Sequence, residues 1–116
     1  MIASMSSAPR VVRKPWGREI VFARNKRYAG KILVIEKGHR LSLQYHKVKR
    51  ETLYLLEGRL HIELGRRRRV AKAGAVIDVP PGTVHRFEAR FGRVKLVEVS
   101  TPELSDIVRL ADDYGR

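Results

Sequence analysis

Turn residues divide the chain into many short apolar segments, and this pattern constrains its fold more than any other feature. Turn signals such as Lys37-Gly38, Glu57-Gly58 and Pro80-Pro81-Gly82 separate runs that are rich in β-branched residues. Many short strands at close, regular spacing favour an antiparallel sandwich or barrel, so we predict an all-β fold. The predicted strands lie at 18–23, 28–36, 41–46, 52–57, 59–64, 68–72, 76–79, 84–88 and 94–99.

The segments outside these strands are assigned from their composition and spacing. A chain of 116 residues has room for one domain of ordinary size. Residues 1–12 are small, polar or basic, and we expect a flexible N-terminal arm there, followed by a single domain at 13–116. A short C-terminal helix is predicted around 103–111, because Leu104 and Ile107 begin a set of apolar residues at helical spacing.

Composition excludes several classes of protein. There is no cysteine, so disulfides and thiolate metal sites are excluded. No apolar run approaches the length of about 18 residues that a membrane span requires. The N-terminus also lacks a basic start followed by an apolar stretch, as a secretion signal would have. We therefore expect a cytoplasmic protein that makes no contact with a membrane.

The chain is strongly basic, with a formal net charge of +13 from 25 Lys and Arg against 12 Asp and Glu. Such an excess attracts anions, including phosphorylated metabolites. Its densest run, Arg66 to Arg69, follows Gly65 between two apolar segments, where a hairpin tip is expected. The basic residues are spread along the chain without a nucleic-acid-binding motif, so we do not expect a nucleic-acid partner.

Polar residues that could carry chemistry lie on and near one predicted strand. Within residues 41–46, side chains alternate across the strand, so Gln44 and His46 share one face. Glu51 follows five residues after His46, and a rigid Pro-Pro-Gly turn precedes His85 on another predicted strand. Imidazole and carboxylate groups bind zinc and other divalent first-row ions readily, and an amide oxygen is a harder, uncharged ligand.

These residues resemble the two sequence motifs of the cupin superfamily. The first motif is matched by Gly38, Gln44, His46, Glu51 and Gly58, and the second by Gly74, Pro80, Gly82 and His85. The resemblance implies a double-stranded β-helix with jelly-roll topology and one bound divalent metal ion. Zinc is the first choice, with manganese, cobalt, nickel and iron as alternatives. The implied metal ligands are Gln44, His46, Glu51 and His85.

Longer stretches resemble one branch of that superfamily, the type II phosphomannose isomerase domain. That domain usually forms the C-terminal part of bifunctional mannose-1-phosphate guanylyltransferase/mannose-6-phosphate isomerases. The resemblance implies interconversion of mannose 6-phosphate and fructose 6-phosphate. The matching stretches are Lys14-Pro15-Trp16-Gly17, Leu41-Ser42-Leu43-Gln44-Tyr45-His46, Val79-Pro80-Pro81-Gly82-Thr83-Val84-His85-Arg86, Asp106-Ile107-Val108-Arg109-Leu110 and Asp113-Tyr114-Gly115-Arg116.

The chain also departs from the pattern of this branch. The family commonly has His-His-Arg after the histidine of the metal strand and His-Trp after the glutamate. The departures lie at Lys47, Val48, Lys49, Thr52, Leu53, Ala89 and Ser100. They leave two alternatives open, a non-catalytic cupin that binds sugar phosphates and another metal-dependent cupin enzyme.

Aldose–ketose isomerisation needs an acid, a base and a cation for the phosphate. Candidate catalytic residues are Lys95, Glu98 and Arg109, and Lys31 is a further candidate for proton transfer. Arginine is preferred for binding phosphate. Candidate substrate-binding residues are Lys49, Arg50, Arg86 and Arg109.

Partners and the remaining aromatic and histidine residues complete the expectations. The family resemblance implies a homodimer, in which residues 10–23 could exchange or pair between copies. Trp16 is expected to pack in the core, because an indole buries a large area. His39 and His61 fit neither motif, so we expect them at the surface or at a pocket rim.

Overall fold

In a computed structural model, residues 2–5 and 8–116 are described, and their regular structure is entirely strands. Residues 1 and 6–7, which belong to the expected N-terminal arm, lie outside the described residues. The strands are β1 (Arg10–Lys14), β2 (Gly17–Arg24), β3 (Ala29–Ile35), β4 (Leu43–Tyr45), β5 (Glu51–Glu57), β6 (Arg59–Leu64), β7 (Arg67–Lys72), β8 (Val76–Val79), β9 (His85–Glu88), β10 (Val94–Ser100) and β11 (Val108–Ala111).

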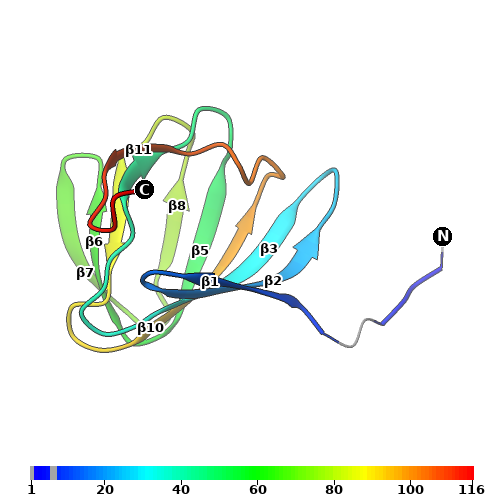
Figure 1. Cartoon of the computed structure of the whole chain (residues 1–116), viewed down its shortest axis with the longest axis horizontal. Helices are drawn as coiled ribbons and strands as arrows, with labels where there is room; N and C mark the ends of the chain where they lie inside the picture. Colours follow the sequence, from blue (N-terminus) through cyan, green and yellow to red (C-terminus); the bar gives the residue numbers. More distant parts are fainter. Residues whose placement is uncertain (1, 6–7) are drawn as a thin grey trace.

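The strands form two antiparallel sheets that face each other (Figure 1). The six-stranded sheet has the order β1-β2-β3-β10-β5-β8, and the five-stranded sheet has the order β11-β4-β9-β6-β7. Chain neighbours are often not sheet neighbours, since β10 lies between β3 and β5. The all-β expectation is confirmed, and segments distant in the sequence meet between the sheets.

The core lies between the sheets and follows from alternation along the strands. In β10, Val94 and Leu96 are fully buried, whereas Val99 is exposed on the opposite face of the sheet. Trp16 is buried at 2% exposure, so the expected packing role is confirmed. The buried apolar cluster comprises Trp16, Leu33, Ile35, Leu41, Leu53, Leu55, Leu60, Ile62, Ile77, Val79, Phe87, Ala89, Val94 and Leu96.

Turn positions agree with the sequence signals. The run from Arg66 to Arg69 lies at the tip of the β6–β7 hairpin and along β7, as expected. Gly58, between β5 and β6, has a φ of +92°, and a Cβ there would lie 2.4 Å from the carbonyl oxygen of Arg93. Only glycine fits this position without moving the backbone.

The expected helix at 103–111 is wrong: the described residues contain no helix, and the segment forms turns followed by β11. The apolar residues have helical spacing, but β11 instead pairs with the edge of β4. The carboxylate of Asp106 accepts backbone N–H groups of residues 47–49, which ties this segment to a distant loop. Tertiary pairing therefore outweighs a weak local preference.

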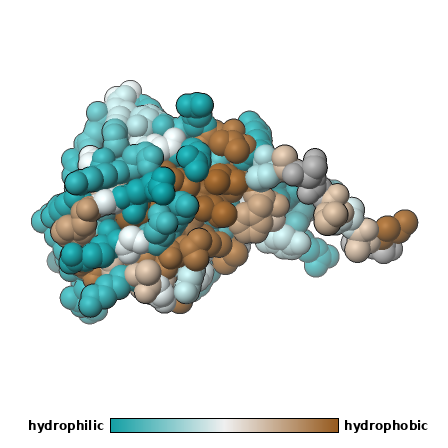
Figure 2. Space-filling view, turned by 90° about the horizontal axis from the view of Figure 1, so that it is seen from below, coloured by the Kyte–Doolittle hydropathy of each residue, from teal (hydrophilic) through white to brown (hydrophobic). Residues whose placement is uncertain are grey.

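The N-terminal hairpin extends the larger sheet. β1 begins at Arg10, within the segment predicted as an arm, and its register with β2 runs from Arg10 opposite Val21 to Lys14 opposite Gly17. The boundary between arm and domain at residues 12 and 13 stays a prediction. Seen from below, apolar side chains gather near the extended N-terminal segment, beside a largely hydrophilic surface (Figure 2).

Within the described part of the chain, no helix has the length and apolar character needed to cross a membrane.

Candidate metal centre and cavity

A cavity of about 400 Å³ opens between the two sheets, and basic residues outnumber acidic ones in its walls. Seven of its lining residues are Lys or Arg and three are Glu. Apolar residues such as Trp16, Leu33 and Phe87 form other parts of the wall. The charged lining residues are Arg10, Lys14, Glu19, Arg24, Lys31, Lys49, Glu51, Glu98, Arg109 and Arg116.

Two histidines and one glutamate converge beside this cavity. His46 follows β4, Glu51 begins β5 and His85 begins β9, so both sheets contribute. The Oε1 atom of Glu51 lies 3.2 Å from His46 Nε2 and 3.1 Å from His85 Nε2. All three side chains are buried, with exposures of 3% or less. Their ligand atoms lie within 4.8 Å of one another, so the group could hold a metal ion.

Backbone carbonyls orient both imidazoles toward this point. His46 Nδ1 donates to the carbonyl oxygen of Asp106 at 2.6 Å, and His85 Nδ1 donates to that of Thr83 at 2.9 Å. Carbonyl oxygens only accept, so each Nδ1 carries the proton. Such second contacts on the far ring nitrogen are typical of metal-binding histidines, because they fix the tautomer and the ring orientation.

The donor set fits a cation better than it fits an empty cluster. A neutral imidazole that donates from Nδ1 has a bare lone pair on Nε2. The Nε2 atoms of His46 and His85 therefore face the Oε1 atom of Glu51, which is also an acceptor. Among the described residues, the buried Nε2 of His85 has no hydrogen-bond partner. A divalent cation between these atoms would satisfy all of them at once.

Gln44, the fourth ligand that the family resemblance implies, lies next to this group. It is directly opposite His85 in the pairing of β4 with β9, so the two side chains share a face. Its Oε1 accepts a hydrogen bond from Ser42 Oγ at 2.6 Å, which leaves a second lone pair on the amide oxygen. Gln44 lines the cavity, and its role as a ligand stays a prediction.

Buried charges of alternating sign lead away from the cluster along the six-stranded sheet. Lys49 Nζ lies 3.3 Å from Glu51 Oε2 and 3.2 Å from Glu98 Oε2. Lys31 Nζ lies 3.8 Å from the same oxygen of Glu98 and 3.0 Å from Glu19 Oε2. The register of β3 and β10 places Lys31 directly opposite Glu98. Each buried charge is therefore paired with at least one opposite charge, as burial requires.

These surroundings shift the pKa values of the buried carboxyls in opposite directions. Burial raises the pKa of Glu98 to about 8, and repulsion from Glu51 adds to the rise. Burial would also raise the pKa of Glu51, but the ammonium of Lys49, 3.3 Å from its Oε2, opposes that rise and holds the pKa below its usual range. The carboxyl nearest the histidines is therefore ionised at neutral pH, as a metal ligand must be.

The structure brings only part of the predicted substrate and catalytic set to the cavity. Glu98, Lys49 and Arg109 line it, and so does Lys31. Arg109 on β11 is directly opposite Gln44 on β4, which places it in one row with Gln44 and His85 on the inner face.

Three predicted site residues do not line the cavity, and the roles predicted for them stay predictions. Side chains alternate between the two faces of β10, so Lys95 lies on the outer face while Glu98 is buried on the inner one. The Nζ atom of Lys95 lies 4.0 Å from Glu57 Oε1. Arg50 is exposed and pairs with Asp78 at 2.9 Å. Arg86 is buried, but its guanidinium donates to the backbone carbonyls of residues 41 and 111 and so has a structural role.

Most departures from the family pattern lie outside the cavity. Leu53 and Ala89 are fully buried in the core, and Thr52 bonds Asp78 on the outer face of the larger sheet. Residues 47 and 48 lie in an exposed loop. Lys49 is the one departure in this set that lines the cavity among the described residues. The pocket lining is therefore changed less than the sequence comparison suggests.

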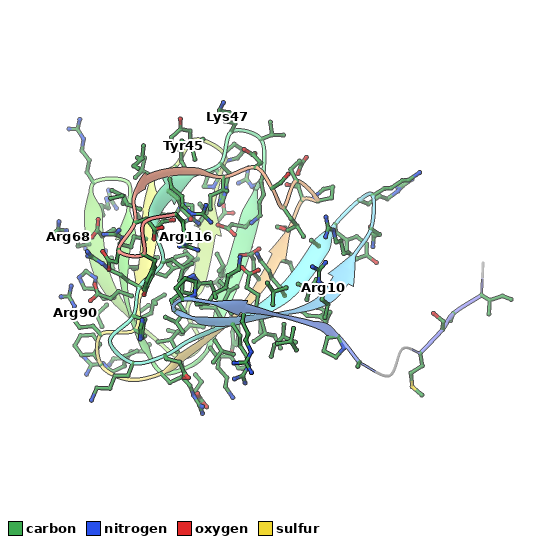
Figure 3. The ribbon with its side chains drawn as sticks, viewed as in Figure 1. Arg10, Tyr45, Lys47, Arg68, Arg90 and Arg116 are labelled. Carbon is green, nitrogen blue, oxygen red and sulfur yellow. The ribbon has the colours of Figure 1, made fainter. Side chains whose placement is uncertain are left out.

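Sequence reasoning missed two contributors to the site. Asp106 binds His46 through its carbonyl and accepts N–H groups of residues 47–49 through its carboxylate, yet it is 60 residues away from His46 in the chain. The N-terminal hairpin supplies Arg10 and Lys14, which alternate toward the cavity along β1. The alternation along residues 10–14 was the available signal, but residues 1–12 were predicted as a flexible arm rather than as part of a strand. Figure 3 shows that other basic side chains, such as Arg68 and Arg90, project away from the body.

Comparison with known proteins identifies the family of this site. The family model described as mannose-6-phosphate isomerase C-terminal matches residues 3–112. The chain belongs to this family. Its membership and its fold confirm the expectation of a cupin that resembles the phosphomannose isomerase domain. A search of curated proteins gives no match.

Solved structures share the fold of this mannose-6-phosphate isomerase C-terminal family member at low sequence identity. KdgF from Halomonas sp. has a TM-score of 0.75 at 15% identity, over 85% of this chain and 96% of that one. An RmlC-like cupin from Shewanella frigidimarina has a TM-score of 0.76 at 18% identity, over 87% and 90%. A double-stranded β-helix protein from Klebsiella pneumoniae gives 0.71 at 17% identity, over 94% and 90%.

Proposed function

We propose that the protein is a divalent-metal-dependent isomerase that interconverts mannose 6-phosphate and fructose 6-phosphate. The observation that carries this proposal is the buried group of His46, Glu51 and His85 beside a cavity with an excess of basic residues. A metal centre and a cationic wall are the two features that an anionic sugar requires. Membership of the mannose-6-phosphate isomerase C-terminal family supports the choice of substrate.

The metal would be held by His46, Glu51 and His85, with Gln44 as the fourth ligand. Nitrogen and oxygen donors of this kind suit zinc first, and manganese, cobalt, nickel or iron as alternatives. When bound, a divalent ion supplies Lewis acidity that polarises the sugar oxygens next to the reacting carbons. A single carboxylate in this set leaves a net positive centre, which favours an electron-rich substrate.

Glu98 is the group that we propose for moving the proton between the two sugar carbons. Among the described carboxylates that line the cavity, Glu51 belongs to the metal group and Glu19 pairs with Lys31 farther along the wall. Glu98 is buried and shares Lys49 with Glu51, which places it next to the metal group. A carboxyl whose pKa is raised to about 8 is suited to both giving and taking a proton near neutral pH.

Arg109 is the group that we propose for holding the phosphate. Among the described residues, its guanidinium has no carboxylate partner, whereas Arg116 is held by Asp112 at 2.9 Å. Two strand spacings separate Arg109 from His85 in their row, which is about 10 Å. That separation allows the phosphate end of an extended sugar phosphate to reach Arg109 while its carbonyl end lies at the metal group.

A second candidate is a cupin that binds sugar phosphates without turnover. The observation that favours it is the pairing of Glu98 with both Lys49 and Lys31, since ion pairs hold a carboxylate in place and oppose proton transfer. Binding would still use the metal group and the basic wall.

The test is a coupled assay of mannose 6-phosphate conversion with metal-free protein to which zinc, cobalt, manganese or nickel is added. We expect metal-dependent turnover that is lost in His85→Ala and kept in His61→Ala, which changes a histidine paired with Glu88 on the outer face. No turnover with any metal, together with binding of mannose 6-phosphate in calorimetry, would favour the non-catalytic candidate. Metal binding without turnover or sugar-phosphate binding would indicate another metal-dependent cupin enzyme.

We also propose that two copies of the chain form a homodimer through the N-terminal hairpin. β1 is an edge strand of the larger sheet, and Val11 on it is 56% exposed. Light scattering on a sizing column would measure the mass, which we expect to halve in Val11→Lys.

We also propose a cytoplasmic location, because sugar phosphates are made and used there. Cell fractionation would test this location.

A further inference from the structure

The two oxygens of Glu51 have different partners. Oε1 faces the Nε2 atoms of His46 and His85 at 3.2 and 3.1 Å. Oε2 accepts a hydrogen bond from Lys49 Nζ at 3.3 Å. Both side chains of this pair are buried, with exposures of 4% for Lys49 and 2% for Glu51, so water does not compete for the bond. One oxygen of the Glu51 carboxylate therefore faces the two histidines, and the other faces the ammonium of Lys49.

Lys49 is itself fixed from several directions. Its backbone N–H donates to Asp106 Oδ2 at 2.8 Å, and its ammonium lies 3.2 Å from Glu98 Oε2. Glu98 is in turn faced by Lys31 from β3. The ammonium thus sits between two buried carboxylates on adjacent strands of the larger sheet. The ammonium cannot turn away from Glu51 without leaving a buried carboxylate without this partner, which is strongly unfavourable.

This geometry disfavours phosphate binding by Lys49, the role expected from the sequence. A phosphate-binding lysine needs donors that are open to the ligand. Lys49 has three N–H donors, its ammonium already faces Glu51 and Glu98, and only 3% of the residue is exposed. The ammonium therefore interacts with the two carboxylates rather than with an incoming phosphate.

We propose that Lys49 is a positioning residue that makes Glu51 a one-oxygen ligand. By holding Oε2, the ammonium leaves only Oε1 for the cation between the two histidines. The inference rests on the metal centre of the proposed function and goes beyond it, because it assigns how that centre is kept open. A carboxylate bound through both oxygens would occupy one further coordination position, which substrate oxygens would otherwise use.

The first test compares cobalt binding in variants that differ at Lys49. Lys49→Met frees Oε2, and the double variant Lys49→Met with Glu98→Gln also removes the buried carboxylate that the single change leaves with Lys31 as its one cation. Cobalt absorption in the visible region weakens as the coordination number rises. We expect weaker absorption per bound ion in both variants and an affinity changed by about 10- to 100-fold. Lys95→Met on the outer face is the matched control.

The second test needs no variant. The infrared stretches of a carboxylate are more widely separated when one oxygen binds a metal than when both do. The metal-induced difference spectrum of the wild-type protein with isotope-labelled glutamate should therefore show the wide separation. Circular dichroism and thermal unfolding would establish that each variant in the cobalt experiment is folded.

The outcomes separate this inference from the proposed function. A folded double variant with the spectrum and cobalt affinity of the wild type would overturn the positioning role and leave the metal centre standing. A narrow infrared separation in the wild type would do the same. Failure of the wild-type protein to bind any of the tested metals would instead overturn the metal centre, and the inference with it.

Discussion

The two sheets contribute different chemistry to the same cavity. The larger sheet supplies charged side chains, with Lys31, Glu51 and Glu98 on three of its strands. The smaller sheet and the loop after β4 supply His85 and His46, whose imidazoles are oriented by backbone carbonyls. The buried charges of the larger sheet are held by opposite charges, and the two imidazoles are held by the backbone. A site of this kind requires both sheets, because neither offers a complete donor set.

The largest expected effect is on metal content, and it comes from neutralising Glu51, the one carboxylate in the group of His46, Glu51 and His85. Glu51→Gln keeps the shape of the side chain but removes the carboxylate that faces both histidines. We expect metal content to fall to background after dialysis, as measured by elemental analysis. Glu57→Gln, the same change at an exposed position of the same strand, should leave metal content unaltered. Retained metal in Glu51→Gln would show that the smaller sheet is sufficient for binding.

Removing a charge farther along the larger sheet should reduce stability. Lys31→Met leaves Glu98 buried with only Lys49 as its cation and leaves Glu19 without its 3.0 Å partner. We expect a loss of about 3 to 5 kcal/mol in the free energy of unfolding in urea. Lys95→Met, on the outer face of the neighbouring strand, should change stability by less than about 0.5 kcal/mol. Equal losses in the two variants would contradict the assigned pairing.

A third prediction concerns the smaller sheet and the substrate. Arg109→Ala removes a charge-assisted hydrogen-bonding group from the row that contains Gln44 and His85. We expect KM for mannose 6-phosphate to rise by about 10- to 100-fold, because such bonds contribute about 1.5 to 3 kcal/mol. Steady-state kinetics would measure this. Arg50→Ala, which changes an arginine paired with Asp78 on the outside, should leave KM unchanged, and a similar rise there would remove Arg109 from its role.

The smallest expected effect is on acid stability. Hydrogen bonds from the backbone N–H groups of Lys49, Lys47 and Val48 lower the pKa of Asp106 from 3.8 to about 2. The unfolded chain therefore takes up this proton first. The stabilisation is complete above about pH 4 and is lost as the pH falls toward 2. Asp106→Asn should flatten the slope of unfolding free energy against pH in this window, and an unchanged slope would contradict the assignment.

The sequence predicted most of the sheets and the centre of the site, for a common reason. Alternation and turn signals are local, and so are the spacings that link Gln44, His46 and Glu51. The family resemblance grouped these three residues with His85 and implied all four as metal ligands. The cross-sheet partners were not predictable in this way, because pairing between β10 and β3 decides that Lys31 meets Glu98 while Lys95 faces outward.

The terminal segments illustrate the same limit. The apolar residues of 103–111 have helical spacing in isolation, and only the free edge of β4 makes them a strand. The basic residues of β1 look like part of a loose arm until β2 provides a partner. In both cases the strand pairing that fixes the structure involves residues outside the segment, so local sequence patterns do not predict it.

The carbonyl of Asp106 that orients His46 has a consequence for synthesis of the protein. A ribosome releases His46, Glu51 and His85 well before it releases Asp106. A nascent chain that has reached residue 100 thus carries the imidazoles and the carboxylate, but one ring is still free to turn. In the proposed metal centre, capture of an ion by fully oriented ligands would therefore be a late event in folding. An ion that arrived earlier would meet a looser set of donors, which would discriminate less among metals.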